Sequence, residues 1–304
     1  MGGFLILKAG VGNMFNIINQ GLFQRVESPR YGRQDIGISP AGCMDRFAYD
    51  VGNILLDNAP GHPALEIIFA PRLAFEKAAW FVLTGACHDP VNLSRDGEIT
   101  PITHGRVYFA PAGSVLGFGT KVYGFRTYLC WREVVDGPGD QDLNGRDRGA
   151  FKDICRWPDP EGMIRVVEGP EYGFVKNPEG FTSQAWQIST DSNHMGLRLV
   201  PSRRAVEIEM GNMISAPVSD GSVQLTPKGP IVLLRHRQTI GGYPRIFNVI
   251  SADVDLLAQY VPGQIIRFKK IDMDRALTVA RERFMDLLKL KEQYTRQDRK
   301  GMDK

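Results

Sequence analysis

Short apolar runs separated by turn residues dominate this chain. Residues 80–84 read Trp-Phe-Val-Leu-Thr and end at a glycine, and residues 107–110 read Val-Tyr-Phe-Ala and end at a proline. Runs of this length, bounded by Gly, Pro and Asp, are typical of β-strands in a barrel or a sandwich. No repeat of about 33–45 residues is present, which disfavours propellers and solenoids. Further runs of the same kind lie at 122–129, 231–234, 246–250 and 265–268.

Three segments instead show the spacing of an amphipathic helix. Residues 44–56 place apolar side chains at helical intervals, with Asp45 expected in the first turn, where a carboxylate suits the helix dipole. A second, short helix is predicted at 252–259. The longest is predicted from Asp272, a suitable N-cap, to about residue 294, and its non-apolar faces are charged. We therefore expect a mainly β fold with a few peripheral helices and an amphipathic helix at the C-terminus.

One stretch of the chain has the composition of a linker. Residues 136–159 combine several glycines and prolines with many charged side chains. A boundary there divides the chain into two β-rich halves of the size of ordinary domains. We expect an N-terminal half at 16–140 and a C-terminal half at 160–292 that includes the last helix.

Composition narrows the possible classes of protein. The 33 glycines and 19 prolines make up about 17% of the chain, above the usual ~12% but below the level of a disordered chain. The net charge is only +3 and no dense basic block is present, so we expect no nucleic-acid partner. The apolar run at 4–7 is shorter than a signal sequence or a spanning helix requires, which favours a cytoplasmic protein that does not bind membranes.

Cysteine and histidine spacing gives no sign of a metal site. The four cysteines lack a Cys-x-x-Cys pair, and the five histidines lack the spacing of metal ligands. We expect reduced thiols and no metal. Walker A, Gly-x-Ser-x-Gly and His-Glu-x-x-His motifs are also missing, so any ATP used in the reaction would bind elsewhere.

The segment 233–244 is the strongest candidate for a functional site. An apolar strand runs into a dense polar set and then into paired glycines, which permit positive φ and close approach to a ligand. Amides in such a turn can cradle an anion, and an arginine can hold a carboxylate or phosphate with two hydrogen bonds. The alternative is an ordinary glycine-rich hairpin with solvated charges. The candidates are Arg235, His236, Arg237, Gln238, Thr239, Gly241, Gly242 and Tyr243.

Two other segments carry weaker signals. His194, in the segment 189–199, can act as a general acid or base near neutral pH, or can be a structural histidine. The Gly/Pro-rich loop 37–45 precedes the first predicted helix, where it can bind an anion or simply form a capped turn. Cys43 has no evident histidine partner, so we do not expect it to be a nucleophile.

Many ordered blocks together resemble one family. The strongest block is 221–268, which contains Gly-Pro-Ile-Val-Leu-Leu at 229–234, Arg-Gln-Thr at 237–239, Gly-Gly-Tyr-Pro at 241–244 and Val-Ile-Ser-Ala-Asp at 249–253. Supporting blocks lie at 39–45, 53–55, 65–66, 83–86, 128–129, 169–170 and 195–199. On these blocks the chain resembles the biotin-dependent carboxyltransferase family, also called allophanate hydrolase subunit 2-like, which includes the C-subunit of 5-oxoprolinase and part of the urea carboxylase carboxyltransferase domain.

The resemblance implies a fold, a partner and a class of substrate. It implies two cyclophilin-like β-barrel halves and a subunit-1-like partner, in a heterodimer or heterotetramer, with a small amide or acyl substrate bound at the interface. Such substrates include urea and 5-oxoproline, and ATP or carboxybiotin on a carrier can take part, with no cofactor attached covalently to this chain. We expect Arg237, Tyr243 and His236 as catalytic residues. Expected substrate-binding residues are Gln224, Arg235, Gln238, Thr239, Gly241, Gly242, Asn193, His194, Met195, Gly196, Ser39 and Asp45.

Departures from the family pattern keep a second hypothesis open. Glu-Ser-Pro-Arg at 27–30 stands where the family has Gln-Asp-Leu-Gly-Arg, and 131–148 lacks the usual glycine-rich and serine-rich stretches. His194 replaces an arginine, and Ile240 replaces a threonine. The first hypothesis is a subunit of a carboxyltransferase or amide-hydrolase complex. The alternative is a non-catalytic binding or regulatory module that antagonises or scaffolds a partner protein.

Overall fold

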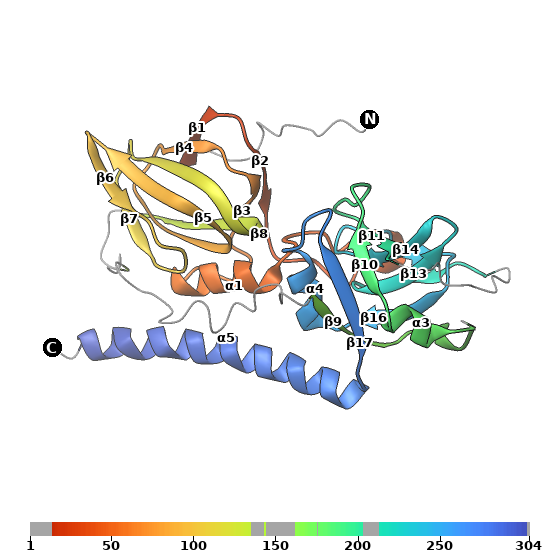
Figure 1. Ribbon diagram of the computed structural model, residues 1–304. Helices are drawn as coiled ribbons and strands as arrows, with labels where there is room; N and C mark the ends of the chain where they lie inside the picture. Colours follow the sequence, from red (N-terminus) through yellow and green to blue (C-terminus); the bar gives the residue numbers. More distant parts are fainter. Residues whose placement is uncertain (1–13, 135–142, 144–161, 175, 203–212, 303–304) are drawn as a thin grey trace. The chain divides into compact units, whose positions relative to one another are not determined.

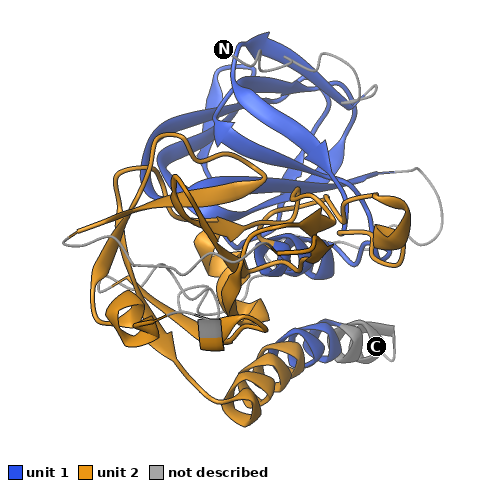
Figure 2. Ribbon diagram, turned by 90° about the vertical axis from the view of Figure 1, so that its right-hand side faces the viewer, with its two compact units in different colours: residues 1–28, 46–155, 286–304 blue, residues 29–45, 156–285 orange. Residues whose placement is uncertain are grey.

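The chain divides into two compact units, which are described separately. The computed structural model describes residues 14–134, 143, 162–174, 176–202 and 213–302 (Figure 1). Unit 1 comprises 1–28, 46–155 and 286–304, and unit 2 comprises 29–45 and 156–285 (Figure 2). The predicted linker at 136–159 lies outside the described residues, apart from position 143.

Unit 1 is an antiparallel half-barrel built around two long strands. The path β1-β4-β8-β3-β2 is extended by β5, which pairs with β6, β7 and β8. Alternate side chains of these strands, such as Leu65, Phe81 and Leu129, form a fully buried apolar core. The strands are β1 (Phe15–Asn19), β2 (Leu22–Val26), β3 (Ala64–Phe69), β4 (Arg72–Phe75), β5 (Ala79–Arg95), β6 (Glu98–Pro101), β7 (Tyr108–Ala110) and β8 (Val115–Glu133).

Helix α1 (Arg46–Leu55) packs on the other face of this sheet. The Thr84 hydroxyl donates to the Ala48 carbonyl across 2.8 Å. A Cβ at Gly52 would lie only 2.5 Å from Cys130 Sγ. The helix therefore needs a glycine where it approaches β8 most closely.

Unit 2 contains a closed barrel in the order β10-β11-β14-β13-β16-β9-β17. All neighbours are antiparallel except β17 and β9, which are parallel. Trp186, Phe181 and Phe247 fill its core. The strands are β9 (Met163–Glu168), β10 (Ala185–Ile188), β11 (Gly196–Pro201), β13 (Ser222–Thr226), β14 (Gly229–Leu233), β16 (Arg245–Val249) and β17 (Ile265–Lys270).

Short elements and one long helix complete unit 2. The 3-10 helices η2 (Gln34–Ile36) and η3 (Tyr172–Phe174), the helix α3 (Pro178–Thr182) and the two-stranded pair β12 (Ala216–Pro217) and β15 (Ile240–Gly241) lie in its loops. Helix α4 (Ser251–Leu257) follows β16 directly. Helix α5 (Met273–Met302) begins in unit 2, where Ala276 and Val279 pack against Ile250 and Ala252.

The fold confirms the predicted class and most predicted elements. The six predicted strands coincide to within one residue with parts of β5, β7, β8, β14, β16 and β17, and the three predicted helices correspond to α1, α4 and α5. Asp272 accepts a hydrogen bond from the Arg275 amide across 2.7 Å, as an N-cap does. The placement of Asp45 in the first turn of α1 is wrong, because that helix begins one residue later, at Arg46. Within the described part of the chain, no helix has both the length and the apolar character needed to span a bilayer.

Candidate functional site

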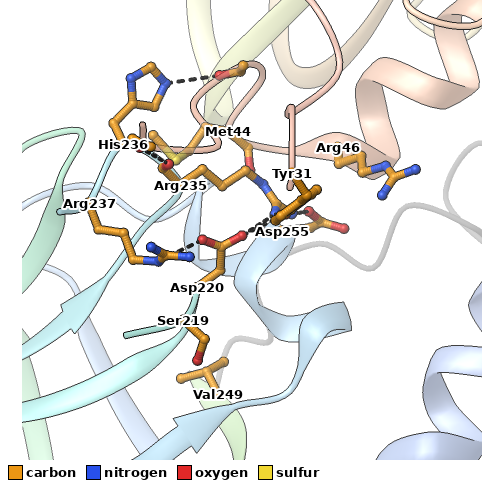
Figure 3. A network of polar contacts seen from close by, with 12 residues as sticks. Tyr31, Met44, Arg46, Ser219, Asp220, Arg235, His236, Arg237, Val249 and Asp255 are labelled. Atoms are coloured by element: carbon orange, nitrogen blue, oxygen red, sulfur yellow. Dashed lines mark hydrogen bonds and ion pairs between the residues drawn. The ribbon is translucent and has the colours of Figure 1, made fainter. Parts of the chain in front are cut away.

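A buried arginine organises the candidate site in unit 2 (Figure 3). Arg235 lies two residues beyond the end of β14, and only 6% of its surface is exposed. Its Nε donates to the Met44 carbonyl and its Nη1 to the Tyr31 hydroxyl, each across 3.1 Å. Nη1 also lies 3.1 Å from Asp220 Oδ2, and Nη2 lies 2.5 Å from Asp255 Oδ1. A guanidinium has five N–H donors, so these contacts commit most of them to the scaffold.

Neighbouring side chains keep the guanidinium group of Arg235 protonated. Burial by itself lowers the pKa of Arg235, but the carboxylates of Asp255 and Asp220 and the side chain of Tyr31 outweigh burial and raise that pKa above its usual value. The Tyr31 hydroxyl donates to Asp220 across 2.7 Å and so completes the contact. Arg235 is therefore a permanent cation inside unit 2 that ties the loop around Tyr31 to the barrel.

Arg237 shares the carboxylate of Asp220 with Arg235. Its side chain is 4% exposed, and Nε lies 2.9 Å from Asp220 Oδ1. The N–H is not aligned for a hydrogen bond, and neither of these two buried atoms has a hydrogen-bond partner among the described residues. Nη1 donates to the Gln238 carbonyl across 3.1 Å. Arg283 joins the group through Asp255, across 3.3 Å, so three guanidinium groups surround two carboxylates.

The loop 39–45 is fastened to the backbone of Arg235. The Ser39 hydroxyl and the Ala41 amide donate to the Arg235 carbonyl across 2.9 and 3.0 Å. Ala41 and Gly42 both have left-handed backbone conformations, with φ of 50° and 76°. Such a conformation is uncommon for a residue other than glycine, and here the hydrogen bonds to Arg235 hold it. His236 Nε2 lies 3.0 Å from the Gly42 carbonyl oxygen.

The remaining predicted residue of this loop is engaged internally. Asp45 is buried and accepts a hydrogen bond from Gln259 Nε2 across 2.8 Å. This contact connects the loop with the residues that follow α4. Asp45 therefore belongs to the predicted site loop, but its carboxylate is committed to a structural contact.

The turn 193–196 brings a second histidine to His236. The rings of His194 and His236 lie 5.3 Å apart between centroids, at an interplanar angle of 79°. The Leu234 amide donates to the Met195 carbonyl across 2.9 Å, and the Met195 amide donates to Asn193 Oδ1 across 2.8 Å. The turn is thus fixed beside the residues that follow β14.

The turn around Gly241 packs on a buried glutamine. Gln224 is 1% exposed, and its Nε2 donates to the Tyr243 carbonyl across 3.1 Å. A Cβ on Gly241 would lie 2.7 Å from that same nitrogen. Neither Gly241 nor Gly242 has a positive φ, so this turn does not use the left-handed conformations that paired glycines permit. Gly241 is required by this close contact and not by its dihedral angles.

The topology also rules out the hairpin alternative for 233–244. Strands β14 and β16 do not pair with each other, because β13 lies between them and pairs with both. Arg235 and Arg237 are buried, whereas a hairpin with solvated charges would expose them. The segment is instead a crossover between non-adjacent strands, and its charges belong to the interior.

The structure gathers the predicted site residues in unit 2 and sorts them by exposure. Asn193, His194, Met195, Gln238, Gly242 and Tyr243 are exposed, His236, Ser39 and Gly241 are half-buried, and Gln224, Arg235, Arg237, Thr239, Gly196 and Asp45 are buried. Thr239 contributes its carbonyl, which accepts from the Val218 amide across 3.0 Å. The accessible surface is therefore neutral or imidazole-bearing, and the permanent positive charge lies beneath it.

Sequence reasoning missed four residues of this site. Tyr31, Asp220, Asp255 and Arg283 complete the arginine network. Two arginines next to a buried strand imply buried counter-charges, because an unpaired charge in the interior is costly. That signal predicts carboxylates nearby but does not say which of the many acidic residues supply them.

Within the described ranges, no group of three or more His, Cys, Asp or Glu side chains is arranged to hold a metal ion.

Comparisons with known proteins agree with the fold and with the sequence blocks. The chain matches the family described as carboxyltransferase domain, subdomain A and B, at residues 36–139 and 140–270. It is 32% identical over 303 residues to the C-subunit of 5-oxoprolinase from Escherichia coli (strain K12), covering 87% of this chain and 93% of that protein. It is 30% identical over 283 residues to the C-subunit of 5-oxoprolinase from Haemophilus influenzae, covering 83% and 89%.

A solved structure shares the fold. The urea amidolyase of K. lactis superposes with a TM-score of 0.77 and 20% identity, covering 91% of this chain. This chain spans only 20% of that much longer protein.

Proposed function

The chain belongs to the carboxyltransferase-domain family (subdomains A and B), and from that premise we propose that it is a subunit of an ATP-dependent complex that hydrolyses a small amide. The two relatives described as C-subunits of 5-oxoprolinase match most of this chain and most of their own length. Their names support a substrate of the 5-oxoproline type, with urea-type amides as the related class.

One observation carries this proposal. Three segments that are far apart in the sequence, at 39–45, 193–196 and 235–243, meet next to the end of β14. The buried contacts of Arg235 with Asp220 and Asp255 fix the base of this arrangement. A rigid cluster of polar side chains built on barrel strands is the kind of support that a substrate site requires.

The exposed side chains suit the amide group of such a substrate. Gln238 offers both a donor and an acceptor, the Tyr243 hydroxyl offers either, and both side chains reach the surface. The N–H and C=O groups of an amide need this combination. Beneath the surface, three guanidinium groups face two carboxylates. The excess positive charge would stabilise negative charge developing on the carbonyl oxygen.

ATP does not fit this site. The guanidinium groups of Arg235 and Arg237 are already paired with Asp220 and Asp255, and a triphosphate would have to displace those carboxylates. We therefore place ATP on another subunit and derive no step through it here. The ureido ring of carboxybiotin carries the same donors and acceptors as a small amide, so Gln238 and Tyr243 would hold it, and that group would supply a carboxyl group when bound.

The surface beside the site suits a protein partner. Met195, Ile240 and Tyr243 are 40%, 58% and 41% exposed, and exposed apolar side chains around a polar site favour an interface. We propose that a subunit-1-like protein covers this surface in a heterodimer or heterotetramer. Its contacts would shield the amide from bulk solvent during the reaction.

Reconstitution tests this proposal. The chain is co-expressed with a subunit-1-like partner and the remaining subunit of the complex, and ATP hydrolysis is measured with 5-oxoproline, with urea and with no amide. We expect the partner to co-purify and one amide to stimulate ATP hydrolysis. A complete complex that no amide stimulates would contradict the amide-hydrolase function.

The internal pairing of the arginines also supports a second candidate function. A site whose arginines are paired with carboxylates inside unit 2 can survive as a scaffold after its chemistry is lost. In that case the chain is a binding or regulatory module. Co-purification with the partner in the absence of any amide turnover would distinguish this module from the enzyme subunit.

A further inference from the structure

We propose that His236 and His194 form the proton-transfer pair of this site, with Nδ1 of His236 as the general base. This inference rests on the proposed amide hydrolysis. Among the exposed and half-buried residues gathered at the site, the two imidazoles are the side chains that ordinarily exchange a proton near neutral pH. They come from separate turns of unit 2, and their rings are in edge-to-face contact.

The Gly42 carbonyl fixes the tautomer of His236. A carbonyl oxygen can only accept a hydrogen bond, so the 3.0 Å contact requires a proton on His236 Nε2. In the neutral ring, Nδ1 then carries the lone pair. Gly42 itself is held in place, because Ser39 and Ala41 both bond the Arg235 carbonyl. A base whose other nitrogen is fixed by an acceptor is the arrangement that orients imidazoles in hydrolytic sites.

His194 supplies the second imidazole of the pair, with its ring 5.3 Å from that of His236 between centroids. The carboxylates around this segment are already engaged. Asp220 pairs with Arg235 and Arg237, and Asp255 pairs with Arg235. Asp45 accepts a hydrogen bond from Gln259.

This arrangement supports a balanced hydrolytic step. As the oxygen of a water molecule bonds to the amide carbonyl carbon, one of its O–H bonds breaks and the proton passes to His236 Nδ1. When the C–N bond breaks, the imidazolium returns that proton to the departing nitrogen. In this step amide and water are consumed, and a carboxylic acid and an amine are formed, with the histidine unchanged. ATP, which we place on another subunit, takes no part in this transfer of the proton.

Histidine NMR on the full chain tests the assignment without any assay of activity. With ¹⁵N-labelled histidine, we expect neutral His236 to show a protonated Nε2 and an unprotonated Nδ1. A protonated Nδ1 in the neutral ring would overturn the proposal. His236→Asn and His236→Gln serve to assign the resonances, and the glutamine variant keeps a donor within reach of the Gly42 carbonyl.

Kinetics of the reconstituted complex test the role. We expect His236→Gln to lower kcat by about 100-fold with little change in KM, the usual size of a general-base contribution. His194→Phe retains the ring packing but removes the second imidazole, so it should also lower kcat with little change in KM. Unchanged kcat in either variant would overturn the pair. A wild-type complex that hydrolyses no amide would instead overturn the proposed function itself.

Discussion

Nη2 of Arg235 lies 2.5 Å from Oδ1 of Asp255, and both side chains are almost fully excluded from solvent. The same carboxylate also contacts Arg283 on α5, and the same guanidinium contacts Asp220 and Tyr31. The cation beneath the candidate site is therefore part of the framework of unit 2. This relationship separates residues that build the site from residues that can meet a substrate.

Removing the carboxylate of Asp255 should destabilise the protein strongly. In Asp255→Asn, Arg235 loses its shortest ionic contact while it stays buried, and breaking a buried pair in this way typically costs about 3–5 kcal/mol. Urea unfolding measures the change. Glu168→Gln is the matched control, because Glu168 pairs with Lys270 on an exposed surface, where single ion pairs contribute little. Equal unfolding midpoints for the two variants would contradict the structural role of Asp255.

The two adjacent glycines of the turn should respond differently to alanine. In Gly241→Ala the new Cβ would meet the Gln224 amide at 2.7 Å, so this buried side chain must move and lose its hydrogen bond to the Tyr243 carbonyl. We expect a loss of roughly 1–3 kcal/mol in unfolding free energy. In Gly242→Ala the nearest atom, Ser215 Oγ, is 3.4 Å away, and stability should hardly change. Thermal unfolding of both variants checks this order, and the reverse order would refute the packing explanation.

Unit 1 should lose stability in mild acid because of His104. Burial above all, and the neighbouring His88, lower the pKa of His104 from 6.5 to about 4. Between these values the unfolded chain binds the proton more readily than the folded chain. The contribution of His104 to the free energy of unfolding is therefore complete above pH 6.5. It is lost as the pH drops toward 4, by roughly 3 kcal/mol in total.

His104→Gln tests this dependence. The glutamine side chain can still accept the hydrogen bond that the His88 amide donates to His104 Nε2 across 3.2 Å, but it does not titrate. Urea unfolding midpoints measured from pH 4 to 7.5 should fall less steeply in the variant. Parallel curves for the variant and the wild type would exclude His104 as a source of acid sensitivity.

The local pattern predicts the elements of this fold well but does not predict all of their partners. Apolar runs and helical spacing locate β5, β14 and α4 because burial of one face depends on residues close in sequence. The segment 29–45 precedes α1 of unit 1 directly, yet it belongs to unit 2. Its attachment depends on hydrogen bonds to Arg235, almost two hundred residues away. The hydrophobic periodicity of the sequence does not reveal a contact over such a distance.

The sequence likewise indicates some residues of the candidate site but not others. The polar set at 235–239 and the turn at 193–196 stand out in the sequence because polar residues and glycines there interrupt apolar strands. Asp220 and Tyr31 carry no such signal, although Asp220 contacts both arginines. The sequence also does not show why a glycine is needed at position 241, because its closest neighbour, Gln224, comes from another strand.

Amide-dependent ATP hydrolysis by the reconstituted complex, compared between Tyr243→Phe and Tyr172→Phe, tests the central claim most directly. Tyr243 is exposed in the candidate site, whereas the Tyr172 hydroxyl contacts Lys270 in another part of unit 2. If Tyr243 donates to the developing oxyanion, its loss should lower the amide-dependent rate by about 100-fold and leave the unfolding midpoint unchanged, while Tyr172→Phe retains the wild-type rate. Equal, wild-type rates in both variants would contradict the placement of the active site at this turn.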